Sequence, residues 1–176
     1  NYVRDGILDL EYKELPYGKS APRKNKKKAL RSLKNRDGLS IEERPKDVER
    51  REVYGHWEMD TVVSGIGKGR GVLLVLTERY SREEKIIKLA NRKQESVIEA
   101  IDNLEREYGT KKFREKFITI TTDNGVEFLD HRGITKVNRT KMYYAHAYSS
   151  WERGSNEVSN RLIRRFYKKG YNIDKI

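Results

Sequence analysis

Three acidic side chains stand out because each lies in a segment whose other residues predict a defined element. Asp60 lies in GHWEMDTVV, Asp123 in TTDNGVEF and Glu157 in SSWERGSNEVSN. The first two fall within or directly after apolar runs typical of strands, and the third lies in a segment with helical spacing. Carboxylates are the hard oxygen ligands that Mg²⁺ prefers. In a basic protein, acids on separate elements favour a divalent-metal site that acts on a polyanion.

Cleavage of a phosphodiester explains why such a site needs several acids. The reaction requires an activated oxygen nucleophile and a stabilised leaving oxygen, and two Mg²⁺ ions about 3.5–4 Å apart supply both. A few carboxylates suffice, because waters and substrate phosphates complete the coordination. The residues therefore predict a nuclease-like or strand-transferring enzyme that works on DNA. The histidines, His56, His131 and His146, lack metal-ligand spacing and are interpreted as structural or DNA-contacting.

Asp60 lies in the middle of a predicted strand, where aspartate is normally disfavoured. Strand alternation places it on the same face as Glu58 and Val62. A partly buried carboxylate needs a cation nearby. That partner is either a metal ion or an arginine, and the position alone favours neither.

Asp123 and Glu157 each have an ordinary structural interpretation. Asp123 begins Asp-Asn-Gly, a common turn signal, but it also follows the carboxyl end of a strand, where α/β sheets place ligand-binding groups. Glu157 is spaced to form an i,i+4 ion pair with Arg161 on a helix surface. Glu127, four residues after Asp123, is a reserve candidate for the third acid or a supporting hydrogen-bonding group.

The charge balance limits the class of partner. Lysine and arginine number 39 against 27 aspartate and glutamate residues, which gives a net charge of +12. Such a chain favours nucleic acid or an acidic membrane surface. No apolar run approaches the ~20 residues that span a bilayer, and no signal peptide is present, so we expect no membrane partner. Cysteine is absent, which excludes disulfides, thiolate zinc sites and a cysteine nucleophile.

Composition changes near residue 50. Residues 1–50 predict a basic, partly flexible arm or linker, and residues 51–176 predict a folded core. A block of one charge sign neutralises phosphates, although a solvated linker has a similar composition. The predicted phosphate contacts of the arm are Lys24, Lys26, Lys27, Lys28 and Arg31. The chain begins at Asn1 and ends at Ile176 without a stop signal, so we expect a piece of a longer, C-terminally truncated protein.

The core predicts strands and helices in the order that a mixed sheet requires. The expected strands are 57–63, 72–77, 85–89, 117–121 and 141–145. Val97, Ile101, Leu104 and Tyr108 recur at helical spacing before Gly109, a typical residue after a helix end. The first three strands favour an antiparallel meander. This order predicts an α/β fold with a five-stranded mixed sheet and helices packed on it.

The last helix combines an apolar stripe with basic residues. Ser149 to Glu152 match a capping box, and Val158, Leu162 and Phe166 predict the face that packs on the core. The basic residues around this stripe suit a track for DNA phosphates. They are Arg161, Arg164, Arg165, Lys168 and Lys169.

The motifs in their order resemble the catalytic core of IS30-family bacterial transposases. The matching segments are GHWEMDTVV, LTERYSRE, TTDNGVEF and YYAHAYSSWERGSNEVSNRLIRRFYKKG, between about Arg44 and Gly170. The resemblance implies a ribonuclease H-like fold, shared with retroviral integrases. It also implies a DDE triad of Asp60, Asp123 and Glu157 that binds two Mg²⁺ or Mn²⁺ ions. The departures at Met59, Ala147 and Lys168 lie outside the triad and indicate divergence.

The same resemblance implies how the protein acts. Water, and then the freed 3′-hydroxyl of the element end, attacks DNA phosphates without a covalent protein intermediate. The implied partners are the terminal inverted repeats, target DNA and further copies of the chain assembled on DNA, in a bacterial cytoplasm at the nucleoid. The family's helix-turn-helix elements are missing, so we expect weak recognition of the ends. Residues that match the motif around the glutamate, and are interpreted as shaping the site and contacting DNA, are Trp151, Arg153, Gly154, Asn156 and Asn160.

Two other functions remain open at this point. One is a catalytically silent, transposase-derived DNA-binding regulator, against which the presence of all three acids argues. The other is a general ribonuclease H-like nuclease. Cutting of RNA–DNA hybrids, or cutting without strand joining, would distinguish it from a transposase.

Overall fold

A computed structural model of the chain describes residues 38–65, 67, 69–146 and 149–176. The predicted arm contacts Lys24, Lys26, Lys27, Lys28 and Arg31 lie outside the described residues. Within the described ranges, none of the helices combines the length and apolar composition needed to cross a bilayer.

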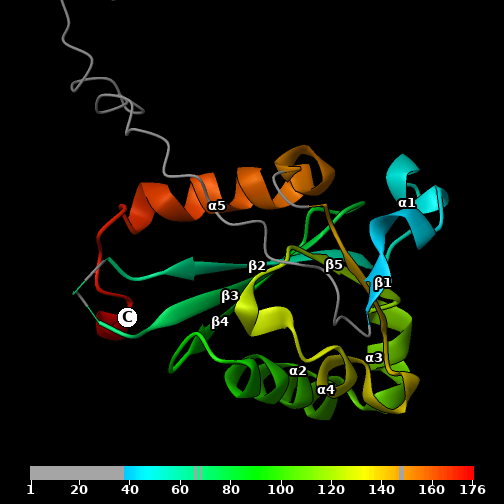
Figure 1. The fold of residues 1–176 in the computed structure, drawn as a ribbon, viewed down its shortest axis with the longest axis horizontal. Helices are drawn as coiled ribbons and strands as arrows, with labels where there is room; N and C mark the ends of the chain where they lie inside the picture. The colour runs from blue at the N-terminus through cyan, green and yellow to red at the C-terminus, as the bar shows by residue number, and fades with distance from the viewer. Residues whose placement is uncertain (1–37, 66, 68, 147–148) are drawn as a thin grey trace, which may run out of the picture. The chain divides into compact units, whose positions relative to one another are not determined.

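A six-stranded mixed sheet forms the centre of the fold, in the order β1-β6-β5-β2-β3-β4 (Figure 1). The strands are β1 (Leu39–Ser40), β2 (His56–Val63), β3 (Val72–Glu78), β4 (Glu84–Leu89), β5 (Thr119–Thr122) and β6 (Lys141–Tyr144). The predicted antiparallel meander of β2, β3 and β4 is confirmed. β5 pairs in parallel with both β2 and β6. The sixth strand, β1, pairs with β6 and was not predicted, because two residues are too few to show periodicity.

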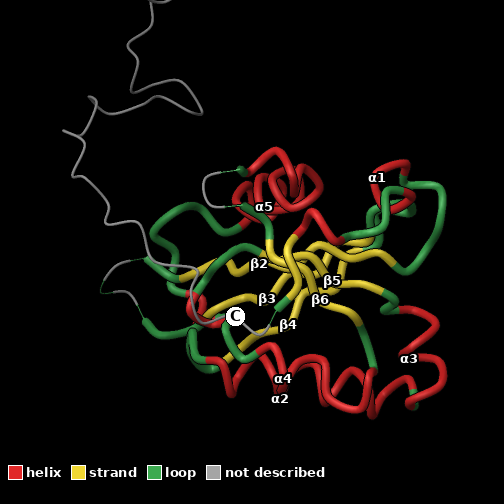
Figure 2. The backbone as a smooth tube through the Cα atoms, turned by 45° about the vertical axis from the view of Figure 1, so that its right-hand side comes forward, coloured by secondary structure: helices red, strands yellow, loops and turns green. Residues whose placement is uncertain are grey.

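Helices cover both faces of this sheet. They are α1 (Asp47–Arg50), α2 (Gln94–Tyr108), α3 (Thr110–Lys116), α4 (His131–Thr135) and α5 (Gly154–Phe166). Short 3₁₀ turns are η2 (Ile41–Glu43), η3 (Val126–Phe128), η4 (Lys136–Asn138), η5 (Ser150–Arg153) and η6 (Ile173–Lys175). Figure 2 shows α5 on one face and α2 and α4 on the other. The α/β layer architecture predicted from the sequence is therefore present.

The main core lies between the sheet and α2. Val97, Ile101 and Leu104 are buried there, as predicted. Gly109 ends α2 with φ +75°, a conformation that favours glycine, and its amide donates to the Glu105 carbonyl. The period-3.6 pattern thus identified both the helix and its end correctly.

β2 divides its side chains between two cores, as alternation predicts. Trp57 and Met59 belong to the core that contains α2. Val62 packs in a second, smaller core with Ile163 of α5. Glu58 and Asp60 lie on this α5 side, where both accept hydrogen bonds from that helix. The predicted common face of Glu58, Asp60 and Val62 is confirmed.

The predicted core stripe of α5 is wrong. Val158, Leu162 and Phe166 are 45%, 42% and 80% exposed. The buried positions of α5 are instead Ser155, Asn156, Ser159 and Ile163. The sheet beneath α5 presents polar groups, and the hydroxyls of Ser159 and of Thr77 on β3, for example, lie 2.9 Å apart. A hydrophobic period cannot detect a helix whose polar face is the one that packs.

The start of α5 also differs from the prediction. Residues Ser150–Arg153 form the turn η5, and α5 begins at Gly154. The Ser149 side chain makes no capping hydrogen bond. Glu152, the expected partner in the capping box, instead accepts a 2.8 Å hydrogen bond from the His146 amide. A tertiary contact therefore replaces the predicted local one.

Candidate active site

Asp60 and Asp123 are neighbours because of strand register. β2 and β5 are parallel, and their register pairs Met59 with Thr122. These are the residues directly before Asp60 and Asp123. The two aspartates therefore lie beside each other at the same edge of the parallel pair, where α/β sheets place functional groups.

The Asp60 carboxylate is held in a fixed orientation. Its Oδ1 accepts from the Thr61 amide at 2.8 Å, and its Oδ2 accepts from Asn160 Nδ2 of α5 at 2.7 Å. Burial raises the pKa of the Asp60 carboxyl above its ordinary range, and the charge of Asp123 adds to the increase. The Arg153 charge and the two hydrogen bonds oppose that rise. Asp60 is thus a carboxylate that needs positive charge close by.

Asp123 lies in a tight turn that ties two strand ends together. Its Oδ1 accepts from the Gly125 amide at 2.8 Å, so the turn interpretation of Asp-Asn-Gly is correct and does not exclude a place in the site. Asn124 Nδ2 donates to the Ala145 carbonyl after β6 at 2.8 Å. A Cβ at Gly125 would lie 2.9 Å from Asp123 Oδ1 and 2.7 Å from Glu127 Oε2. Only glycine fits this position without displacing a carboxylate.

A guanidinium group lies between the two aspartates. Arg153 Nη1 is 3.8 Å from Asp60 Oδ2, and Arg153 Nη2 is 3.5 Å from Asp123 Oδ2. The partner cation of Asp60 in this structure is therefore an arginine. Because Arg153 comes from η5, directly before α5, the start of this helix is tied electrostatically to β2 and to the turn after β5.

Glu157 does not join the two aspartates. It is exposed on the first turns of α5, three residues before Asn160, whose amide contacts Asp60. Within the described part of the chain, no group of three or more histidine, cysteine, aspartate or glutamate side chains is close enough to hold a metal ion. The structure brings Asp60 and Asp123 together. The third member of the predicted triad, Glu157, lies one helical turn before Asn160, the residue of α5 that contacts Asp60.

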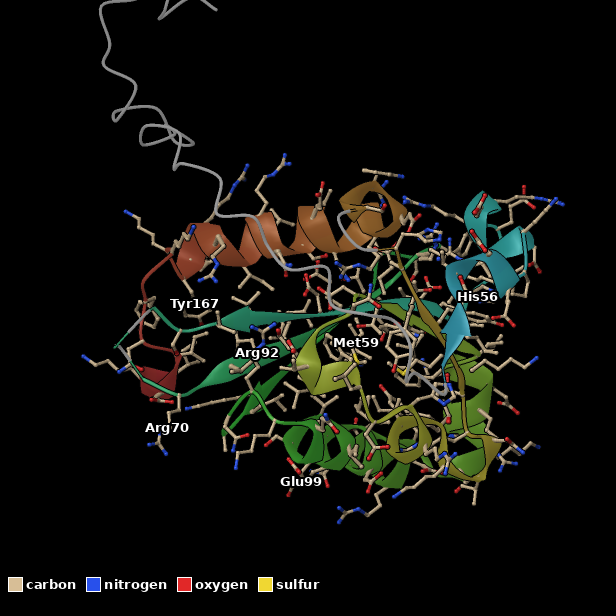
Figure 3. The ribbon with its side chains drawn as sticks, viewed as in Figure 1. His56, Met59, Arg70, Arg92, Glu99 and Tyr167 are labelled. Atoms are coloured by element: carbon tan, nitrogen blue, oxygen red, sulfur yellow. The ribbon has the colours of Figure 1, made fainter. Side chains whose placement is uncertain are left out.

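Glu127, the alternative candidate for the third acid, is buried beside the site and connects two of its elements. It accepts from Thr61 Oγ1 at 2.7 Å and from Arg92 Nε at 2.6 Å (Arg92 is labelled in Figure 3). Its Oε2 is buried and has no hydrogen-bond partner among the described residues. Glu127 therefore links β2 to the turn that carries Asp123.

Sequence reasoning missed a buried ion pair that anchors α5. Glu58 is fully buried and accepts from Arg79 Nη1 and, at 3.0 Å, from the Asn156 amide. Arg79 Nε donates to the Val48 carbonyl at 3.1 Å. A carboxylate at a helix N-terminus is favourable because free amides point toward it. Alternation had placed Glu58 on the face of Asp60, which was the available signal.

The predicted DNA contacts around α5 fall into two groups. Those that are exposed are Trp151, Arg161, Arg165, Lys168 and Lys169. Arg164 is half-buried and donates to the Val63 carbonyl at 3.1 Å. Asn156 is 1% exposed, so a direct contact with DNA does not fit this structure. Asn160 is half-buried and donates to Asp60, and Gly154 is half-buried at the start of α5.

His146 joins the turn before α5 to the N-terminal part of the described chain, and this link predicts a pH effect. Its Nδ1 is 2.8 Å from Glu152 and its Nε2 is 3.3 Å from Glu42. Glu152 first, and then Glu42, raise the pKa of His146 above its ordinary value of 6.5. A raised pKa means that the stabilisation is complete below 6.5 and is lost as pH rises through the folded-state pKa.

We therefore expect the difference in melting temperature between the wild-type chain and His146→Gln to shrink from about pH 6 to about pH 8. Differential scanning calorimetry across this range measures the difference, and an NMR titration of the His146 ring measures its pKa. A pKa at or below the ordinary value, with a constant difference in melting temperature, would contradict the prediction.

The chain is similar to an integrase core domain and to bacterial transposases. The sequence profile described as the integrase core domain matches residues 50–150. The probable transposase of insertion-like sequence element IS1161 from Streptococcus salivarius is 36% identical over 176 residues, which cover 100% of this chain and 48% of that protein. The transposase InsI of IS30A from Escherichia coli (strain K12) is 31% identical over 159 residues, 88% of this chain and 38% of that protein. The chain thus spans about half the length of such relatives or less.

Solved structures agree with this fold. The simian T-cell lymphotropic virus intasome, in complex with PP2A regulatory subunit B56 gamma, aligns with a TM-score of 0.52. The alignment has 14% identity and covers 74% of this chain and 41% of that chain. The ribonuclease H-like α/β class predicted from the sequence is confirmed, and the relatives confirm the predicted resemblance to IS30-family transposases.

Proposed function

Because this chain belongs to the integrase core domain family, we propose that it is the catalytic part of a DDE-type DNA transposase. It cleaves phosphodiester bonds at the ends of an insertion element and joins the freed 3′-hydroxyl to target DNA. The observation that carries this proposal is the pair of aspartates on neighbouring strands, Asp60 within β2 and Asp123 directly after β5, which share one cationic group. We infer that residues 51–176 carry the catalytic site and that the basic residues before them neutralise phosphates. Within residues 1–50, β1 pairs with β6 of the sheet and Val48 of α1 is buried, so this segment is not an arm over its whole length.

The residues present fit a divalent metal at this position. The integrase core family is metal-dependent. Asp60 and Asp123 offer hard oxygen donors, and the Arg153 guanidinium between them shows that the pair attracts positive charge. These two aspartates would hold the metal, and Glu157 would complete the ligand set. Two Mg²⁺ or Mn²⁺ ions, when bound, activate the attacking oxygen and stabilise the leaving oxygen.

The surrounding side chains orient the acids for this work. Asn160 and the Thr61 amide fix both oxygens of Asp60, and the Gly125 amide fixes one oxygen of Asp123. Preorganised ligands lower the cost of assembling a charged site. Asn160 of α5 contacts the Asp60 carboxylate. Glu157 lies one helical turn before Asn160 on the same helix, so we infer that it reaches the metal bound at Asp60.

DNA is the substrate that the charge distribution supports. Exposed basic residues lie along α5, the helix whose Asn160 contacts Asp60, and the whole chain carries a charge of +12. Such residues track phosphates and give affinity without reading sequence. We infer that the partners are the terminal inverted repeats of the element, target DNA and further copies of the chain on DNA. The place of action follows as the bacterial cytoplasm at the nucleoid.

A two-part assay tests the function. The purified chain is incubated with supercoiled plasmid and Mg²⁺ or Mn²⁺, together with a labelled duplex that has a free 3′-hydroxyl. Nicking together with joining of the label to plasmid supports the transposase. Binding without nicking favours the regulator, and cutting of an RNA–DNA hybrid without joining favours a ribonuclease H-like nuclease.

Glu157 is expected to be the third acid of the reaction. Glu157→Gln should lower plasmid nicking by on the order of 10²–10⁴-fold, because a metal ligand contributes several kcal/mol to the transition state. The side chain is exposed, so the free energy of unfolding should change by less than about 0.5 kcal/mol. Nicking rates and urea unfolding measure the two effects.

Two matched variants complete this test. Glu99→Gln makes the same change at an exposed position of α2, on the other face of the sheet (Figure 3), and should nick at the wild-type rate. Glu127→Gln should destabilise the fold by about 1–3 kcal/mol, because a buried carboxylate that connects two elements is altered. If Glu157→Gln nicks normally and a folded Glu127→Gln does not, Glu127 is the third acid.

A further inference from the structure

The Arg153 guanidinium is held by charge more than by hydrogen bonds. Its distances of 3.5 and 3.8 Å to the two aspartates exceed the ~2.7–2.9 Å of a strong charge-assisted hydrogen bond. Its Nε and Nη1 are buried and have no hydrogen-bond partner among the described residues. The side chain is 13% exposed. A cation bound in this way is attracted to the pair but is not locked in place.

The electrostatics of the pair require such a cation. Asp60 and Asp123 lie side by side through strand register, and two adjacent carboxylates repel each other unless positive charge intervenes. Arg153 supplies one positive charge. A divalent ion supplies two and accepts carboxylate oxygens directly, so it satisfies the same pair more fully.

Two other arginines near the site are engaged with other groups. Arg92 pairs with Glu127, and Arg164 donates to the Val63 carbonyl. Among the ion pairs of the described residues, only those of Arg153 reach both aspartates. Arg153 also belongs to η5, a short turn at the start of α5 whose Trp151 is 74% exposed. The turn that carries Arg153 is therefore partly at the surface.

We propose that Arg153 is an internal counter-cation that divalent metal displaces. In the metal-free protein it holds Asp60 and Asp123 together and keeps the site in order. When metal binds, the guanidinium leaves the carboxylates and becomes a ligand for a DNA phosphate beside them. This inference rests on the proposed function, because it assumes that the aspartates bind metal.

The exchange couples metal binding to DNA binding. A guanidinium engaged with two carboxylates is unavailable to phosphate, and its release adds one charge-assisted contact for the DNA backbone. Coupling between binding sites is reciprocal. DNA that captures Arg153 therefore raises the affinity of the aspartates for metal, and metal raises the affinity for DNA.

Competition between Arg153 and metal has a direct readout that does not depend on catalysis. Mn²⁺ is titrated into the full 176-residue chain and into Arg153→Gln, and free Mn²⁺ is followed by electron paramagnetic resonance. Without its competitor, the site should bind Mn²⁺ roughly tenfold more tightly, which corresponds to ~1.4 kcal/mol. Arg106→Gln removes the same charge from an exposed position of α2, where the Arg106 side chain donates to Asn103. It should change the Kd by less than about twofold, because distant charges are screened.

A second measurement uses the unaltered chain, so the proposal remains testable if Arg153→Gln fails to fold. Mg²⁺ is added to the ¹⁵N-labelled protein, and the arginine Nε–H signal of Arg153 is followed by NMR. The exchange predicts a shift that saturates together with metal binding. Equal Mn²⁺ affinity of wild type and Arg153→Gln, or an unmoved Arg153 signal at saturating Mg²⁺, overturns the exchange alone. Absence of metal binding in every variant overturns both the exchange and the metal-dependent function.

Discussion

Asp60→Asn is expected to lower metal-dependent nicking of plasmid DNA by on the order of 10²–10⁴-fold. The fold should survive, because asparagine keeps an oxygen that can accept from the Thr61 amide or from Asn160. The substitution removes the charge that attracts the metal and one of the two hydrogen-bond acceptors. Nicking rates at saturating Mg²⁺ measure the effect, and near-UV circular dichroism verifies the fold.

A DNA-binding measurement distinguishes a variant that has lost catalysis from one that has lost its folded structure. Asp60→Asn should bind a short duplex with the wild-type salt dependence, because phosphate contacts come from basic side chains. Fluorescence anisotropy over a salt series measures this. If Asp60→Asn still nicks DNA, Asp60 is not a metal ligand. Its carboxylate would then have only the structural role of pairing with an arginine.

Glu58→Ala is expected to cost about 3–5 kcal/mol of unfolding free energy. The substitution removes a buried carboxylate and leaves the Arg79 guanidinium uncompensated. It also removes the acceptor of the Asn156 amide at the start of α5. Urea unfolding followed by circular dichroism gives the free energy directly.

The same variant should weaken catalysis, because α5 carries Asn160 and Glu157. Glu99→Ala is the matched control on α2, and its unfolding free energy should lie within about 0.5 kcal/mol of the wild-type value. A loss below about 1 kcal/mol for Glu58→Ala would mean that the pair with Arg79 behaves as an exposed ion pair. In that case α5 would be held mainly by its small apolar core.

Patterns of short range determined much of this protein from its sequence alone. Alternation along β2 placed Glu58, Asp60 and Val62 on one face, and the spacing of apolar residues identified α2 and its end at Gly109. These predictions hold because side-chain direction within one element follows from backbone geometry. The mixed α/β sheet followed from the order of such elements, and the ribonuclease H-like class followed from the resemblance to a known family.

Contacts between distant elements were decided only by the tertiary structure. The parallel register of β2 and β5 brings Asp60 beside Asp123, and η5 inserts Arg153 between them. The face of α5 was misread because its buried side is polar and pairs with groups of the sheet. The spacing of residues along the chain determines which side of a helix each one occupies. It does not determine which groups pack against that side, because for α5 these groups come from a strand about a hundred residues earlier.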